Sequence, residues 1–256
     1  MKPVSIAMIR ILLLMPFLMV NIAYAEIPIE VVTAEGSVTV GDATGKVIKP
    51  VQTKSILPSG QILSTGPSAR AVVRVGSDGI IVMGKNSQIE IGKSKERVGF
   101  FRQITGVVYY ALNSIKGKQR PIEVRTATST IGIRGTRFIV TDVEERKEIG
   151  MRKGEVSVAS PEGEFEVHKQ AQLDEFEALK REAEQAVAKE QREFEAYSAN
   201  TQKEFIEYKR EFSLGADRMV SFDGKRVDDR PLSGETKNDM ESFEGYAEQW
   251  LKTVSD

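Results

Sequence analysis

The chain of 256 residues contains no cysteine, which excludes disulfides, thiolate metal sites and a cysteine nucleophile. Its only histidine is His168, so a Ser–His–Asp triad or a histidine metal cluster is not expected. Hydrolysis by paired carboxylates needs two acids facing one cleft, and no sequence pattern here places such a pair. We therefore expect no enzyme activity, no cofactor and no metal. An envelope hydrolase is kept only as a remote alternative.

A long apolar run is also missing after the N-terminus. Residues 1–25 have the pattern of a secretory signal peptide, with Lys2 and Arg10 before an apolar centre and Ala23-Tyr24-Ala25 before Glu26. A spanning helix needs about 20 apolar residues, whereas Pro16 interrupts the short run between Arg10 and Glu26. We expect cleavage, no transmembrane span afterwards and, because the run starts almost at residue 1, no cytoplasmic arm.

Charge is unevenly distributed along the chain. The net charge is −1, and removal of the leader's two basic residues makes it −3. Residues 26–168 carry 20 basic and 16 acidic residues, whereas residues 171–212 carry 7 against 11. This asymmetry indicates either a basic surface for an acidic protein, lipid head group or glycan, or an acidic helix lying on its own basic domain. Nucleic acid is not expected for an exported chain with a pI of about 6.1.

Residues 26–168 are predicted to form short strands separated by glycine turns. One hairpin is expected over residues 71–83, and Gly36-Ser37-Val38-Thr39-Val40 resembles Gly154-Glu155-Val156-Ser157-Val158 as a weak internal repeat. A sandwich, a roll and a β-helix-like stack all fit this pattern. His168, where this region ends, is expected to face solvent in a linker.

Residues 169–213 are predicted to form a long amphipathic helix, because residues 170–212 lack glycine and proline and are rich in helix formers. At 1.5 Å per residue such a helix spans roughly 60 Å and outreaches a domain of this size. It either continues as one helix or breaks near residues 198–201 into a helical hairpin. We expect its apolar face to mediate self-association or docking. The candidate contact residues are Phe176, Val187, Phe194, Tyr197 and Phe205.

Residues 214–256 are expected to form a hairpin and a short helix. The dipeptide Asp223-Gly224 between two apolar runs is a strong hairpin signal. The following helix would place apolar residues on one face, which something must cover. These residues are Met240, Phe243, Ala247, Trp250 and Leu251.

Residues 126–140, with the sequence TATSTIGIRGTRFIV, contain a change of strand phase. Ile131 and Ile133 alternate on odd positions, whereas Phe138 and Val140 alternate on even ones. Because strand side chains have a period of two, one extra residue is needed between the runs. Gly135 allows a bulge or corner with positive φ there. We take Arg134, Gly135 and Thr136 as the candidate structural or binding corner. Arg134 either anchors a carboxylate or phosphate or ties backbone carbonyls at the bulge.

This stretch closely resembles the signature of the FecR-domain family, in which Thr-Pro precedes Gly-Val-Arg-Gly-Thr-x-Phe. The chain departs from it at Ala127, where the family often has proline. The weaker resemblance extends over about residues 30–160. It implies an all-β extracytoplasmic module in envelope signalling, without the cytoplasmic anti-sigma part. Together with the leader it implies a periplasmic location.

We therefore expect an exported, non-enzymatic FecR-like module that acts through protein partners in the cell envelope. The alternative is a module that binds a small anionic ligand or an envelope glycan through the basic β face. Sequence alone leaves the partner, the signal and the oligomeric state open.

Overall fold

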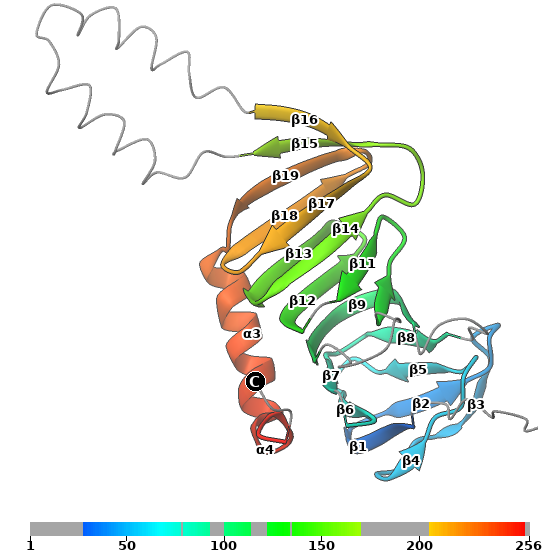
Figure 1. Cartoon of the computed structure of the whole chain (residues 1–256). Coiled ribbons are helices and arrows are strands. Elements are labelled where there is room, and N and C mark those ends of the chain that lie inside the picture. Colours follow the sequence, from blue (N-terminus) through cyan, green and yellow to red (C-terminus); the bar gives the residue numbers. More distant parts are fainter. Residues whose placement is uncertain are drawn as a thin grey trace, which may run out of the picture.

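The described part of the chain forms two layers of β-sheet, with a helix packed on the outside of one layer (Figure 1). A computed structural model of the protein describes residues 28–77, 79–92, 100–113, 122–133, 135–169 and 205–253. Strands dominate these residues, so the mainly β class predicted from the sequence is confirmed. The signal-peptide prediction lies outside them.

One layer, here called sheet A, contains eleven of the described strands and is antiparallel except where β15 pairs with β19. In spatial order its strands are β4 (Ser55–Ile56), β1 (Ile29–Glu35), β6 (Arg70–Val75), β7 (Gly79–Met83), the second half of β9 (Phe100–Leu112), β12 (Thr136–Val143), β13 (Arg146–Lys153), β18 (Arg218–Asp223), β19 (Arg226–Pro231), β15 (Phe165–Lys169) and β16 (Phe205–Lys209).

The other layer, sheet B, is shorter and has one parallel pair, between β9 and β10. In spatial order its strands are β3 (Val47–Pro50), β2 (Val38–Gly41), β5 (Ile62–Thr65), β8 (Gln88–Ile91), the first half of β9, β10 (Glu123–Arg125), β11 (Thr130–Ile133), β14 (Glu155–Ala159) and β17 (Glu211–Gly215).

The two layers share strand β9. Its first residues pair with β8 and β10 in sheet B, and its residues from Gly106 on pair with β7 and β12 in sheet A. Gly106 has φ +98°, and a Cβ there would collide with Ser87. Glycine is therefore required where β9 bends from one sheet into the other.

The main hydrophobic core lies between the sheets. Strands with one solvent face show the expected alternation, as in β14, where Val156 and Val158 are buried between more exposed neighbours. Both sheets contribute to this core, for example Tyr110 and Phe138 from sheet A, whose rings stack at 5.0 Å. Burial of these side chains is the main force that holds the layers together.

A second apolar cluster covers the outer face of sheet A. All five residues of β7 are buried, because Ile81 faces the inner core while Ile80 lies under the C-terminal helices. These helices are α3 (Gly234–Tyr246) and α4 (Glu248–Leu251). A strand buried on both faces reads as a continuous apolar run rather than an alternating one.

The C-terminal predictions are confirmed. Strands β18 and β19 form an antiparallel hairpin whose turn contains Gly224 with φ +59°. Helix α3 starts after Ser233, whose hydroxyl accepts the Thr236 N–H at 3.1 Å. The predicted apolar face of the helix packs on sheet A in the second cluster. Among the residues that the structure describes, no helix has the length and apolar character needed to span a bilayer.

The predicted long helix is wrong. Its C-terminal part forms β16, which pairs antiparallel with β15, and β17, which pairs antiparallel with β14. Phe212 and Leu214 alternate into the core from β17, whereas their neighbours remain outside. Tertiary pairing thus overrides the helix-forming composition here. Residues 170–204 of that prediction lie outside the described residues.

Candidate functional site

The signature corner is the point at which the chain passes from sheet B to sheet A. Ile131 and Ile133 point into the core from β11 in sheet B, whereas Phe138 and Val140 do so from β12 in sheet A. Gly135 lies between the two strands with φ +84°. The predicted phase change is confirmed, and its cause is a change of sheet. A register shift of β12 against β13 at Arg137/Phe138 adds a bulge.

A second crossing lies directly against this corner. The chain returns from β13 in sheet A to β14 in sheet B through Gly154, which has φ +84°. A Cβ on Gly154 would lie 2.6 Å from the carbonyl oxygen of Gly135. The earlier repeat motif places Gly36, with φ +72°, between β1 in sheet A and β2 in sheet B. The weak repeat therefore encodes one device, a positive-φ glycine at a crossing from sheet A to sheet B.

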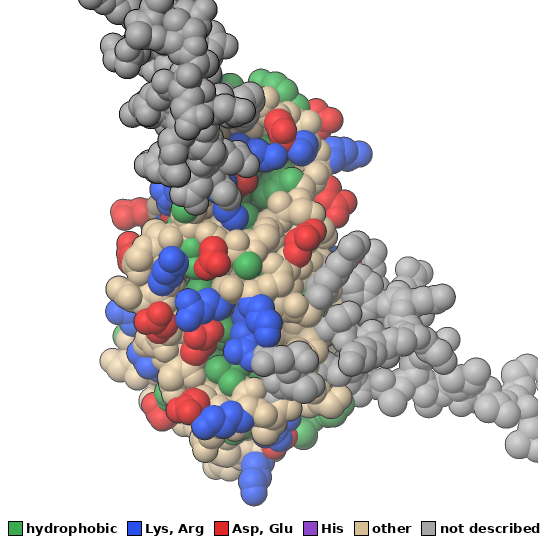
Figure 2. All heavy atoms as spheres, turned by 60° about the vertical axis from the view of Figure 1, so that its left-hand side comes forward, with side chains coloured by type: hydrophobic (Ala, Val, Ile, Leu, Met, Phe, Trp, Pro, Cys, Tyr) green, Lys and Arg blue, Asp and Glu red, His purple; other side chains and the backbone are tan. Residues whose placement is uncertain are grey.

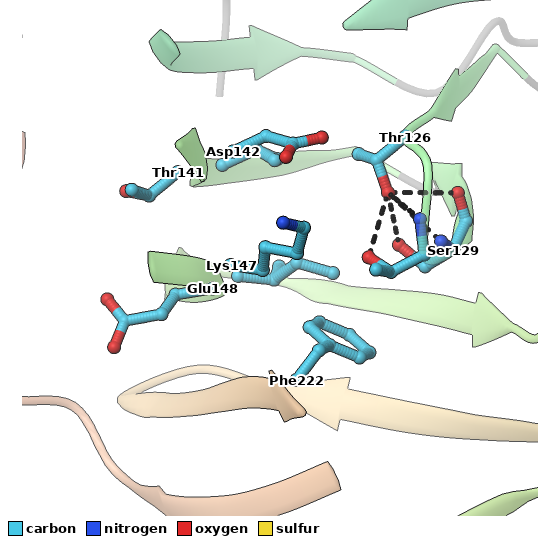
Figure 3. A pocket seen from close by; sticks show the side chains of 10 residues that line it. Thr126, Ser129, Thr141, Asp142, Lys147, Glu148 and Phe222 are labelled. Carbon is cyan, nitrogen blue, oxygen red and sulfur yellow. Dashed lines mark hydrogen bonds between the residues drawn. The ribbon is translucent and has the colours of Figure 1, made fainter. Parts of the chain in front are cut away.

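The threonine-rich half of the signature forms a tight turn before β11 (Figure 3). Thr126 Oγ1 accepts the backbone N–H of Thr128 at 3.2 Å and that of Ser129 at 3.0 Å. The same oxygen lies 3.1 Å from the Ser129 hydroxyl. Such a turn is a standard use of a threonine hydroxyl. These signature residues therefore serve the local backbone.

Asp142 on β12 faces this turn (Figure 3). Its carboxylate accepts the backbone N–H of Ala127, yet its Oδ2 has no hydrogen-bond partner among the described residues. Burial raises the pKa of Asp142, and the charge of Lys147 and the Ala127 N–H only partly offset this rise. The hollow between Asp142 and the turn has no room for a ligand. Asp142 is therefore a buried acid at the signature turn rather than part of a binding pocket.

A groove of about 660 Å³ lies between α3 and the loops that precede β6 and β8. Its basic lining residues are Arg70, Lys85 and Arg146, and its acidic ones are Glu35, Glu235 and Asp239. The view towards α3 shows basic and acidic side chains interleaved rather than gathered by sign (Figure 2). The groove therefore offers no charge preference for an anion.

Part of the predicted charge asymmetry is used inside the molecule, between α3 and sheet A. Arg146 on β13 lies 2.5 Å from Glu235 and 3.6 Å from Asp239, both on α3. Tyr109 of β9 donates its hydroxyl hydrogen to Glu244 Oε1 at 2.6 Å. An acidic helix therefore does lie on a basic β surface, but the helix is α3 rather than residues 171–212.

Basic residues of sheet B are also partly paired. Arg102 lies 2.5 Å from Glu90, and Arg125 lies 3.0 Å from Glu123. The Arg125 guanidinium also stacks over the Phe100 ring at 4.3 Å. These pairs reduce the free positive charge that a basic binding face would present.

The predicted corner residues are only partly described. Arg134 lies outside the described residues, Gly135 is half-buried, and Thr136 is buried at the start of β12. Gly135, Thr136 and Arg137 line a hollow of about 50 Å³, which is far below the size of ordinary ligand pockets. The part of the corner that is described is structural.

The predicted helix contact face is not assembled as a helix. Phe205 is the first residue of β16, paired with Lys169. The other members, Phe176, Val187, Phe194 and Tyr197, lie outside the described residues. Self-association through one long helix that includes Phe205 is therefore withdrawn.

The prediction of a solvent-facing His168 is wrong. His168 belongs to β15, is 5% exposed and places its Nε2 2.8 Å from Glu166 Oε1. Within the described part of the chain, no group of three or more histidine, aspartate and glutamate side chains is arranged to hold a metal. Burial of His168 follows from the pairing of β15 with both β16 and β19, which sequence alone does not reveal.

The match to a known family falls on the middle of this fold. Residues 61–157 match the family model described as FecR protein, so the resemblance is confirmed and the chain contains a FecR domain. The matched segment runs from β5 to β14 and includes the signature corner.

The remaining comparisons were made with whole proteins. The curated proteins give no match. Two crystal structures, at 1.65 and 2.50 Å resolution, of a "putative anti-sigma factor" from Parabacteroides distasonis ATCC 8503 match with 10% identity and a TM-score of 0.45. The match covers 69% of this chain and 62% of each of those chains, so this chain spans less than two thirds of their length.

Proposed function

We propose that the protein is a regulatory module of the cell envelope that acts by protein contact in the periplasm. The observation that carries the proposal is the FecR domain over residues 61–157, at the centre of the two-layer fold. The FecR resemblance implies envelope signalling, and the pattern of residues 1–25 is that of an export leader. The described hollows supply no arrangement that favours a catalytic alternative.

A transcription experiment with matched complementation tests this role. A strain that lacks the gene is compared with the parent strain by RNA sequencing, and is then complemented with the full chain or with residues 26–256 preceded by methionine. We expect a defined set of transcripts to change on deletion. Only the exported chain should restore these transcripts. Unchanged transcripts, or equal restoration by the leaderless chain, would contradict the proposal.

Export is measured separately. Intact mass spectrometry of the periplasmic fraction should give a chain that begins at Glu26. Replacement of both Ala23 and Ala25 by arginine should retain the leader, because cleavage requires small residues at these positions. A chain of unprocessed mass in the soluble periplasm would argue against the assigned cleavage site.

A further inference from the structure

Exposed apolar side chains gather at the two ends of the stack of strands. Of the six large hydrophobic side chains that are exposed in the described part of the chain, five lie on terminal strands. They are Val47 (59% exposed), Ile48 (54%) and Ile56 (61%) on β3 and β4, and Ile206 (48%) and Tyr208 (67%) on β16. Isolated exposed apolar residues are ordinary, but this concentration at strand edges is not.

The strands that carry them are also open along one edge. Among the described strands, β3 pairs only with β2, β4 only with β1, and β16 only with β15. Each therefore has a row of backbone N–H and C=O groups without a sheet partner. Such an edge is a template for a further strand, and natural proteins usually cover or charge it.

The two ends lie at opposite extremes of the molecule (Figure 1). Sheet A ends in β4 at one extreme and in β16 at the other, while sheet B ends in β3 and β17. A second copy shifted along the stack would place its β4 against β16 and its β3 against β17. Both sheets would then continue from one copy into the next.

The ends carry opposite charge. Residues 42–56, which contain β3 and β4, have three lysines and one aspartate, a net charge of +2. Residues 160–169 and 205–211, which contain β15, β16 and the start of β17, have five acidic and three basic residues, a net charge of −2. Contact between unlike ends is therefore favoured, whereas contact between two β3–β4 ends would oppose like charges.

We propose that the β3–β4 end of one copy binds the β15–β17 end of a second copy, so that the protein associates head to tail. The contact is heterologous, because two different surfaces meet, and it does not close after two copies. It uses backbone edges and the five exposed apolar side chains, and it is independent of the regulatory role proposed above.

Charge-reversing variants at each end test the contact. The first-end variant, Ile48→Glu with Ile56→Glu, places acids where the acidic end should dock. The second-end variant, Ile206→Lys with Tyr208→Lys, places bases where the basic end should dock. Ile104→Lys is the matched control, because Ile104 is exposed at 37% on β9, away from either end. All five substituted side chains are exposed, so the unfolding midpoint should stay within the small range of surface changes.

Sedimentation velocity on residues 26–256, from micromolar to high micromolar concentration, gives the readout. The unaltered chain and the Ile104→Lys control should increase in mean mass with concentration and continue beyond a dimer. Each end variant alone should remain monomeric, with self-association weakened about tenfold or more, equivalent to about 1.4 kcal/mol.

An equimolar mixture of the two end variants is the decisive sample. Each variant retains one unaltered end, and these two ends are complementary, so the mixture should form one-to-one dimers and nothing larger. A monomeric unaltered chain, or a mixture that stays monomeric, overturns the proposal. An end variant that still dimerises alone also overturns it, because the contact would then join like ends.

Discussion

At the scale of single residues, Gly154 shows how the fold depends on glycine at its crossings. Its φ of +84° disfavours any side chain, and a Cβ would press on the Gly135 carbonyl oxygen at 2.6 Å. We expect Gly154→Ala to destabilise the protein by ~1–3 kcal/mol, as measured by urea unfolding. Gly215→Ala, where a Cβ meets nothing within 4 Å, is the control and should change stability little.

Asp142 gives a prediction for the dependence of stability on pH. Because burial raises its pKa above the usual 3.8, the protonated form favours the folded state. This contribution is fully present below pH 3.8 and is lost as pH rises through the folded-state pKa. Asp142→Asn keeps an oxygen acceptor for the Ala127 N–H and removes the charge. The stability of the variant relative to the parent should therefore be greatest near neutral pH and should shrink on acidification.

Asp42 is the control with the opposite sign. A hydrogen bond from the Thr44 hydroxyl, followed by the Thr44 backbone N–H, lowers its pKa, so its contribution is present above pH 3.8 and is lost on acidification. Denaturant unfolding between pH 3.5 and 7 compares the two asparagine variants. Parallel pH trends in the two variants would contradict the assignment for Asp142.

The residues of the signature were foreseeable only in part. The phase change between Ile133 and Phe138 and the permissive Gly135 are local features, so the sequence predicted a corner there. Asp142 was missed because its partner, the Ala127 N–H, is fifteen positions away and meets it only after β11 and β12 enter different sheets. The Thr126-x-Thr128-Ser129 spacing was a usable signal for a hydroxyl-bonded turn.

At the scale of elements, α3 functions as a cover for sheet A. Met240 is fully buried between α3 and the sheet, in the cluster that also contains Tyr109. Met240→Ala should lower the free energy of unfolding by about 2–5 kcal/mol, because it leaves a cavity. Lys237→Ala on the exposed face of the same helix is the control and should have little effect. A similar loss in both variants would indicate damage to the helix itself.

The sequence predicted short elements better than long ones. The β18–β19 hairpin and α3 have local signals, namely Asp223-Gly224 and the spacing of apolar residues. Strands β16 and β17 were assigned to a helix, because Glu, Lys and Gln dominate the residues before them. The alternation of Phe212 and Leu214 with polar neighbours, along with the aromatic Phe205 and Tyr208, was a strand signal that the helix-like composition outweighed.

At the scale of the whole molecule, the family match is smaller than the folded unit. Residues 61–157 include β6 and β14 but omit their partners β1 and β17. The order of the strands, including the parallel pairing of β15 with β19, depends on such distant contacts and was not predictable from local pattern.

A fragment of residues 61–157 should therefore fail to fold alone, whereas residues 26–256 should unfold cooperatively. The fragment would expose core residues such as Val73 and Val156 that the missing strands cover. Circular dichroism during urea titration measures this difference. A sharp, cooperative transition for the fragment would show that β1 and β17 are dispensable.

Strand β9 has a mechanical consequence. Its unbroken backbone is stitched into both layers, so neither layer can slide along the other unless the ladders on one side of Gly106 come apart. A load applied at either extreme is carried across the molecule by covalent bonds at this seam. The molecule should therefore twist or bend as a single plank, with Gly106 as its stiff midrib rather than a joint.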